Sequence, residues 1–359
     1  MSWTLRPARE FARHAEDWSR LHAALAPQQA SSLLAAAFVA PLVASFGRGD
    51  ELLACLREGD RIRAMAIVHP SRRGAWSTFQ PAQAPVGLWL QEEGLDTATA
   101  ARSLLGTLPG FPLLLALTQM DPHLSPRPQD GPLTRTLDYI DTARVTLEGS
   151  FDDYWNARGK NLRGNLKKQR ARLEREGVTT RMVVDRAPAA MAQAVSDYGR
   201  LETAGWKGGE GTAVSSENAQ GRYYRAMLEG MAANGAASVY RYYFGEQLVA
   251  MDLCVEDGDS IVVLKTAYDE SVPSNLSPTL LMREEATRKL FEAGRFTRLE
   301  FYGRVMEWHT RWTEEVRTMY HVNYYRWPGL ARLHGLLEAR SQVRSRTSSP
   351  AAHTTTTSL

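Results

Sequence analysis

Three titratable side chains lie close together in the C-terminal part of the sequence, in the segment RLEFYGRVMEWHTRW. Glu300 and Tyr302 alternate with apolar residues, so on a strand they point to the same face. A carboxylate beside a phenol at a strand end can supply a general base and a general acid. His309 follows after a short loop and is a further candidate, because imidazole titrates near neutral pH. A salt bridge for Glu300 and an ordinary surface position for His309 are the structural alternatives.

A second candidate site lies in the segment LKTAYDESVPSNLSPTLL, where an apolar strand opens onto a polar loop before a helix. Ser277 fits the N-cap of this helix, and Pro278 fits its first turn. The free N–H groups and the positive dipole end at such a start favour a bound anion such as phosphate. Simple helix capping explains the same residues, so both interpretations stay open at this point.

Two further segments carry features of ligand binding. Trp206 and Lys207 begin a glycine-rich loop, which either connects two helices or lets the backbone approach a ligand closely. The segment from Arg158 to Glu176 is a predicted helix with eight basic residues and two carboxylates, a net charge of +6 in a chain of +3. It predicts either a solvated face or an electropositive wall for CoA phosphates, a nucleic acid or an acidic polymer.

Composition and motifs limit the class of protein. The 359 residues are 43% hydrophobic and 23% charged, which is typical of a globular chain with about two domains. Cys55 and Cys254 lie far apart in apolar runs, which indicates buried thiols in a reducing compartment. The N-terminus is charged, and the longest apolar stretch (33–46) contains proline, so we expect a cytoplasmic protein without a membrane span. Metal-ligand spacings, a nucleophile elbow and nucleotide-binding glycine motifs are absent, and we expect no metal.

The elements that must position these residues follow the same order in both halves of the chain. Helical periodicity is followed by strand-like runs with tight turns at Glu58–Asp60 in the first half and at Gly245-Glu246 and Asp257–Asp259 in the second. A helix over about 279–293 ends at Gly294. We predict an α+β fold with two domains, residues 1–148 and 149–340, and a disordered tail over 341–359.

Four segments occur in an order and at a spacing that resemble the C-terminal half of FemAB-like (CelD-like) GNAT acyltransferases. They are NLRGNLKKQRARLEREG, ETAGWKGGEGTAV, LKTAYDESVPSNLSPTLL and LEFYG. The resemblance covers about residues 150–330, while the first half resembles a degenerate N-terminal copy mainly in its element order. It implies two tandem GNAT-like domains, each a mixed, mainly antiparallel sheet flanked by helices, with the C-terminal one catalytic.

The resemblance also implies where ligands bind. In GNAT folds two parallel central strands separate, the thioester of acyl-CoA docks in the gap, and the pyrophosphate lies at the following helix start. In this chain the first of these strands is 260–267. The family usually carries glycine where this sequence has Thr279. The candidate cofactor-binding residues are Lys265, Asn275, Leu276, Ser277, Pro278 and Thr279, and the candidate substrate-binding residues are Trp206, Lys207 and Asp252.

The implied activity is transfer of an acyl group from acetyl-CoA or another acyl-CoA to an amine or hydroxyl of a sugar or a cell-envelope or exopolysaccharide precursor. Glu300 would accept the proton, Tyr302 or Tyr268 would protonate the leaving thiolate, and His309 is a further candidate. The expected partners are a small-molecule or saccharide acceptor and polysaccharide-synthesis proteins rather than a nucleic acid. The alternatives are an aminoacyl-tRNA-dependent FemAB-type transferase, whose basic helix would hold tRNA, and a non-catalytic scaffold in polysaccharide synthesis.

Overall fold

The structure is a computed structural model that describes residues 1–26, 30–204, 214–215 and 217–336. The tail predicted over 341–359 lies outside these residues. Within the described residues, thirteen strands form one sheet, and helices cover both of its faces. The strands are β1 (Ser2–Pro7), β2 (Leu52–Glu58), β3 (Arg61–Arg72), β4 (Ala75–Thr78), β5 (Trp89–Gln91), β6 (Leu114–Met120), β7 (Thr134–Thr146), β8 (Thr180–Asp185), β9 (Ala237–Phe244), β10 (Gln247–Glu256), β11 (Ser260–Tyr268), β12 (Arg298–Phe301) and β13 (Val316–Tyr325). The helices are η1 (Ala8–His14), α1 (Ala15–Ala23), η2 (Ser32–Leu34), α2 (Ala36–Phe46), α3 (Thr97–Thr107), α4 (Phe151–Asn156), α5 (Lys160–Arg175), α6 (Pro188–Ala204), α8 (Ala219–Ala233), α9 (Pro278–Ala293) and α10 (Glu307–Thr310).

The order of the strands shows that the sheet is built from two similar halves. It runs β1-β2-β3-β4-β6-β13-β7-β12-β11-β10-β9-β8, and β5 pairs with β3 outside this path. Read from either end, three antiparallel pairings lead to one parallel pairing, β4 with β6 or β11 with β12. The predicted fold class, two GNAT-like copies with mainly antiparallel sheets, is thereby confirmed.

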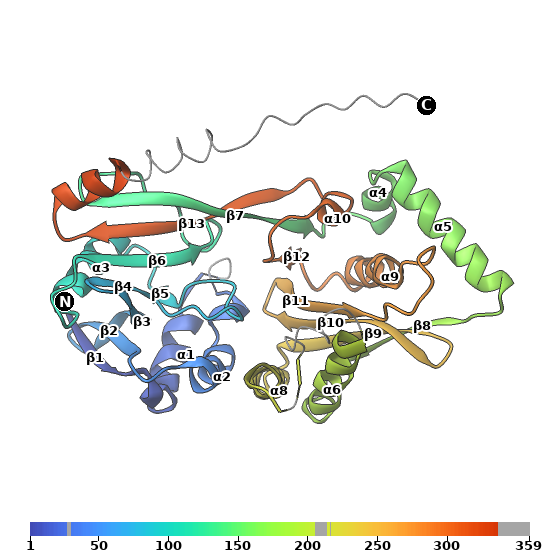
Figure 1. The fold of residues 1–359 in the computed structure, drawn as a ribbon, viewed down its shortest axis with the longest axis horizontal. Coiled ribbons are helices and arrows are strands. Elements are labelled where there is room, and N and C mark those ends of the chain that lie inside the picture. The colour runs from blue at the N-terminus through green and yellow to red at the C-terminus, as the bar shows by residue number, and fades with distance from the viewer. Residues whose placement is uncertain (27–29, 205–213, 216, 337–359) are drawn as a thin grey trace, which may run out of the picture.

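The two halves exchange one strand each. β7 precedes the predicted boundary at residue 148, yet it pairs with β12 of the second half and with β13. β13 lies near the end of the second half and pairs with β6 of the first. Figure 1 shows these two long strands running side by side across both halves. The predicted boundary stays a prediction, because the sheet is continuous through the exchanged strands.

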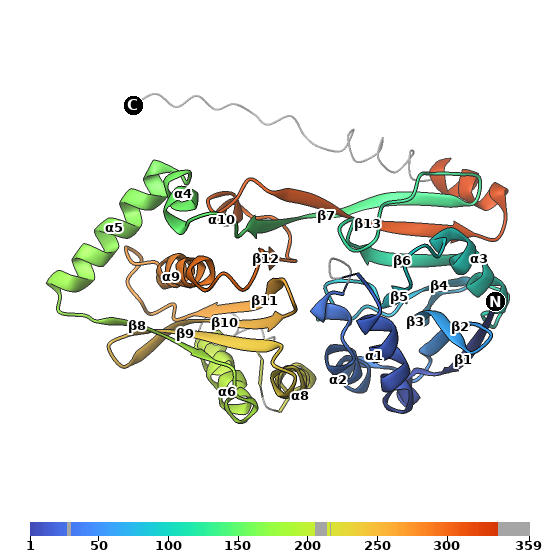
Figure 2. The ribbon, with the colours of Figure 1, turned by 180° about the vertical axis from the view of Figure 1, so that it is seen from behind.

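Three apolar clusters hold the helices on the sheet. One cluster continues from α1 and α2 of the first half to α6 and α8 of the second, where Phe38 and Tyr223 meet at a ring distance of 6.0 Å. A second cluster joins α4, α5 and α9 to the opposite face of the C-terminal strands, and a third holds α3 on the N-terminal strands. Figure 2 shows from behind the same division of helices between the two faces. Because α2 and α8 pack directly against each other, the two halves share one hydrophobic core.

Local signals placed most elements of the second half. The residues of α9 follow the prediction to within one position, and Gly294 takes the left-handed conformation (φ 59°) that ends such a helix. Strand β1 was not predicted, although Trp3 and Leu5 alternate with polar residues, because the run is short and leads directly into the helical pattern that follows.

Candidate active site

The central parallel strands of the second half separate soon after they meet. β11 pairs with β12 through only three positions, Ser260 to Val262, and β11 then continues to Tyr268. Phe301 of β12 still pairs with Ala143 of β7 but no longer with β11. An irregularity in the pairing of β10 with β11 lies just beyond this point, and such bulges bend a strand. A gap between β11 and β12 therefore opens towards the start of α9, as a GNAT-type site requires.

The start of α9 forms one wall of a pocket of about 900 Å³ beside this gap. Leu276 to Leu280 line the pocket, and Pro278 occupies the first helical turn as predicted. The side chain of Ser277 makes no capping hydrogen bond, and its backbone N–H donates instead to Oε1 of Gln169 on α5 at 2.8 Å. Ser277 therefore occupies the predicted N-cap position, but its side chain does not cap the amides of the first turn, and Gln169 of α5 accepts the Ser277 amide itself.

A buried ion pair forms the inner end of the pocket. Nη2 of Arg283 on α9 lies 2.8 Å from Oδ2 of Asp252 on β10, and both side chains are almost fully buried. Thr266 donates to Asp252 through its hydroxyl at 2.5 Å. Burial raises the pKa of Asp252, whereas Arg283 opposes this change. Arg283 itself lines the pocket, whereas Asp252, a predicted substrate-binding residue, is not among the lining residues and pairs with Arg283.

The loop around α10 closes the other side of the pocket. Trp308, Arg311 and Trp312 line it, whereas His309 is only 4% exposed and stacks on Trp308. Nδ1 of His309 accepts the backbone N–H of Met306 at 2.9 Å. Burial lowers the pKa of His309 to about 4, so the imidazole is neutral at pH 7 and shapes the loop.

Glu300 and Tyr302 lie on the face of β12 opposite α9. Arg317 of β13 donates to Oε2 of Glu300 at 2.8 Å, and Tyr302 donates to Oδ2 of Asp121 at 2.8 Å. Arg317 also donates to both oxygens of Asp121, at 2.9 Å and 2.7 Å. Burial raises the pKa of Glu300, while the Arg317 charge and hydrogen bond lower it. The salt bridge named as an alternative for Glu300 is present, and Glu300 also stands at the vertex where β11 and β12 part.

Tyr268 and Lys265, on the same strand, point to different faces. Tyr268 lines the pocket and is 47% exposed, so its phenol is accessible to a ligand. Lys265 lies on the other face, with Nζ 3.7 Å from Oε1 of Glu202 on α6. Glu202 also accepts the backbone N–H of Val214, which fixes the end of the glycine-rich loop. The candidate residues Trp206 and Lys207 of that loop lie outside the described residues.

The predicted residues are thus divided between two faces of the sheet. Leu276 to Thr279 and Tyr268 meet in the pocket, Asn275 is an exposed neighbour, and Glu300 and Tyr302 approach the strand gap from the far side. Sequence reasoning missed Arg283, although an arginine on the buried stripe of α9 is an available signal. It also missed Asp121 and Arg317, which no local pattern brings together.

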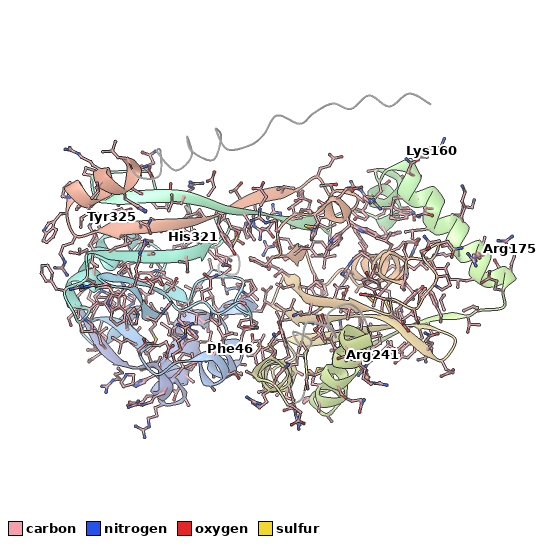
Figure 3. All side chains as sticks on the ribbon, in the orientation of Figure 1. Phe46, Lys160, Arg175, Arg241, His321 and Tyr325 are labelled. Carbon is pink, nitrogen blue, oxygen red and sulfur yellow. The ribbon has the colours of Figure 1, made fainter. Side chains whose placement is uncertain are left out.

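The basic helix α5 packs on the sheet through a stripe of leucines. Leu162, Leu166 and Leu173 are buried against the sheet side. Figure 3 labels Lys160 and Arg175 at the two ends of this helix, on the outer edge of the molecule. Some of its charges are paired, such as Arg170 with Glu284 of α9 at 2.9 Å. The remaining basic side chains give α5 a positive outer face.

The chain matches a family model by sequence and several solved structures by fold. Residues 160–310 match the family model described as the acetyltransferase (GNAT) domain. The structure matches FemX with a TM-score of 0.53 and 9% identity, over 89% of this chain and 98% of that one. It matches L-PGS from Bacillus licheniformis with a TM-score of 0.50 and 11% identity, over 86% and 91%. An Agrobacterium fabrum domain (DUF2156), described as the C-terminal part of a lysylphosphatidylglycerol synthetase, gives a TM-score of 0.54 and 14% identity, over 87% and 92%.

Three negative findings complete the description. No curated protein sequence matches the chain. Among the described residues, no group of three or more His, Cys, Asp or Glu side chains is placed to hold a metal ion. The same residues contain no helix with the length and apolar character needed to cross a bilayer.

The matched domain contains the strand gap, the helix start and α10. At these identities the structural likeness shows the fold alone, and that fold extends over nearly the whole chain. Residues 160–310 therefore match the acetyltransferase (GNAT) domain by sequence, and the fold of nearly the whole chain is similar to that of FemX.

Proposed function

We propose that this protein transfers an acyl group from acyl-CoA to an amine or hydroxyl acceptor, at the gap between β11 and β12. The observation that carries the proposal is the early separation of these strands beside the start of α9. Beyond Val262, the edge of β11 that faces β12 has no strand partner among the described residues, so its backbone groups are available to an extended ligand such as pantetheine. The start of α9 adds N–H groups and a positive dipole end.

The pocket supports a placement for the two ends of acyl-CoA. The pyrophosphate would lie at Ser277, Pro278 and Thr279, where the helix dipole favours negative charge. Arg283 and Arg311 line the same pocket, as do Asp269 and Glu270. The thioester would lie in the strand gap beyond Val262, where β11 no longer pairs with β12. Lys265 points away from this pocket, so the placement rests on the helix start and the strand gap.

The chemistry is direct attack of the acceptor on the thioester carbonyl. A C–N or C–O bond forms, the C–S bond breaks, the acceptor loses a proton and the CoA thiolate gains one. Glu300, whose pKa burial raises, would take the acceptor proton from the far face, directly or through water. Tyr268 is the accessible phenol on the pocket side and would protonate the thiolate. Because thiolate leaves readily, positioning in the gap contributes more than acid–base chemistry.

The acceptor class rests on the sequence resemblance. That resemblance supports an acceptor from sugar, cell-envelope or exopolysaccharide chemistry, and the two free, buried cysteines support a cytoplasmic site of action. Asp252 supports the pocket through Arg283, and in this proposal it positions that guanidinium rather than contacting the acceptor.

The positive outer face of α5 favours a second candidate, an aminoacyl-tRNA donor in place of acyl-CoA. A gel shift with bulk tRNA at low and moderate salt tests this candidate, because phosphate contacts weaken steeply with salt. Salt-sensitive retardation that disappears when Lys160, Lys167 and Lys168 are changed to Gln supports tRNA. Retardation that survives these changes, or none at all, counts against it.

Calorimetric titration with acetyl-CoA tests the main proposal. We expect binding that weakens when Thr279 is replaced by Glu, since a carboxylate at the helix start repels the pyrophosphate. We expect Glu300→Gln and Tyr268→Phe to lower kcat in an acetyl-transfer assay with an amine panel by about 10²-fold or less. Tyr139→Phe, at an exposed tyrosine of β7 outside the pocket, is the matched control. Absence of heat and of any thermal shift at millimolar acetyl-CoA refutes the proposal.

A further inference from the structure

The first half of the chain has a pocket at the position that corresponds to the proposed acyl-CoA site. β4 pairs with β6 in parallel through only three positions, Ala75 to Ser77, as β11 does with β12. A pocket of about 440 Å³ lies between the start of α3, the end of β6 and the exchanged strand β13. Its size falls in the range of small-molecule sites.

The charge of this pocket differs from that of its counterpart, which Arg283 and Arg311 line together with Asp269 and Glu270. The N-cap of α3 is Asp96, whose carboxylate accepts the backbone N–H of Thr99 at 2.8 Å. Glu93 also lines the pocket, and none of its described lining residues is Lys, Arg or His. Glu92 and Asp121 line it too, but Glu92 pairs with Arg61 and Arg63, and Asp121 pairs with Arg317. A carboxylate at the helix start occupies the place of a bound anion and repels phosphate. The N-terminal pocket is therefore unsuited to acyl-CoA and suited to a cation.

A buried phenol at the inner end of the pocket lacks a hydrogen-bond partner. Tyr324 is 0% exposed and lines the pocket, and its hydroxyl has no partner among the described residues. The neighbouring Tyr320 is satisfied, because its hydroxyl donates to the carbonyl oxygen of Ser125 at 2.9 Å. Burial raises the pKa of Tyr324, and the nearby Asp96 carboxylate raises it further, so the phenol stays neutral. A buried polar atom without a partner is costly, and a ligand that pairs with it relieves this cost.

We propose that this pocket binds an organic ammonium ion, a primary amine with a second polar group. The ammonium lies near the carboxylates of Glu93 and Asp96 and beside the lining residues Trp89 and Tyr320, since aromatic rings attract cations. The second polar group pairs with the Tyr324 hydroxyl. An organic cation fits better than a metal ion, because no group of three metal-ligating side chains exists among the described residues.

The test is calorimetric titration of the full chain without acyl-CoA, so its outcome is independent of the acyl-transfer proposal. The probes are 1,4-diaminobutane and glucosamine, each compared with its N-acetylated form. Tyr324→Phe removes only the unpaired hydroxyl, and Asp96→Asn removes the charge while asparagine still caps the helix. Tyr223→Phe is the matched control, since Tyr223 is equally buried, has a hydroxyl without a partner among the described residues and lies outside the pocket.

We expect at least one amine to bind and its acetylated form to bind at least about tenfold more weakly, as loss of a charged hydrogen bond implies. Tyr324→Phe should weaken binding about tenfold, Asp96→Asn should weaken it severalfold, and Tyr223→Phe should leave it unchanged. Thermal unfolding shows that the variants remain folded, and Tyr324→Phe should not lower the midpoint. Failure of both amines to bind at about 10 mM, a concentration on the order of the weakest useful affinities, overturns the proposal. Equal binding by the Tyr324→Phe and Tyr223→Phe variants overturns it as well.

Discussion

The buried network around Arg317 makes a strong prediction about stability. Arg317 pairs with Asp121, whose side chain is 0% exposed, and with Glu300, whose side chain is 4% exposed. Arg317→Met keeps the aliphatic stem but leaves two buried carboxylates without their main counter-ion. Breaking a buried pair by removing one partner costs about 3–5 kcal/mol. Because Tyr302 still donates to Asp121 and Arg298 stays 3.7 Å from Glu300, we expect the lower end, about 3 kcal/mol.

The pH dependence of this loss identifies its cause. In the wild type, hydrogen bonds and the charge of Arg317 outweigh burial and hold the pKa of Asp121 below its usual value. That carboxyl therefore contributes stability above its unfolded pKa of about 3.9, and the contribution is lost as pH falls through the folded pKa. Without Arg317, the hydrogen bonds from Tyr302 and the His123 amide remain, but burial is the largest influence and raises the folded pKa of Asp121, so the variant takes up a proton as pH falls. The difference in unfolding free energy between the two proteins should narrow from pH 7 to pH 4.5.

Urea unfolding followed by tryptophan fluorescence measures both effects. Adding Asp121→Asn to Arg317→Met should recover about 1 kcal/mol or more at pH 7, since it removes one unpaired buried charge. Arg20→Met, at an exposed i,i+4 pair with Glu16, is the control and should cost about 0.5 kcal/mol or less. A cost below about 1 kcal/mol for Arg317→Met, or a cost independent of pH, would refute the reasoning.

Three further predictions concern single positions. Thr279→Gly should tighten acetyl-CoA binding about two- to fivefold, because it removes a Cβ at the proposed pyrophosphate site; unchanged or weaker binding by calorimetry contradicts this placement. Gly87→Ala should lower the thermal midpoint strongly, because the added Cβ would lie 2.2 Å from the carbonyl oxygen of Thr118. Gly106→Ala in α3 is the contrasting change: its added Cβ would have no atom within 4 Å, so alanine should raise stability by about 0.5–1 kcal/mol. The pKa of His309 is about 4 in the folded protein and about 6.5 in the unfolded chain, so the unfolded chain binds more protons between these values and stability falls as pH drops through this range. His309→Gln should remove up to about 3 kcal/mol of this pH dependence. Identical urea unfolding curves of the wild type at pH 7 and pH 4.5 would argue against this role.

Local signals in the sequence were sufficient for the elements on the pocket side of the second half. The Ser-Pro pair and Gly294 mark the two ends of α9. The leucine stripe of α5 indicates which face of that helix packs on the sheet. These signals depend on neighbours within about one helical turn, which is why they can be read without a structure. The alternation of Glu300 and Tyr302 likewise predicted a shared face, and Tyr302 and Glu300 do converge on one network with Arg317.

The partners of those residues were decided only by the tertiary structure. Arg317 and Asp121 are 196 positions apart, and they meet because β7 and β13 cross between the halves. Strand periodicity says which side chains share a face and says nothing about which strand lies next to them. The sequence by itself therefore determined the two similar halves, the helix start and the candidate residues. Strand exchange determined which partners those residues meet, because pairing between distant segments is set by the packing of the whole sheet.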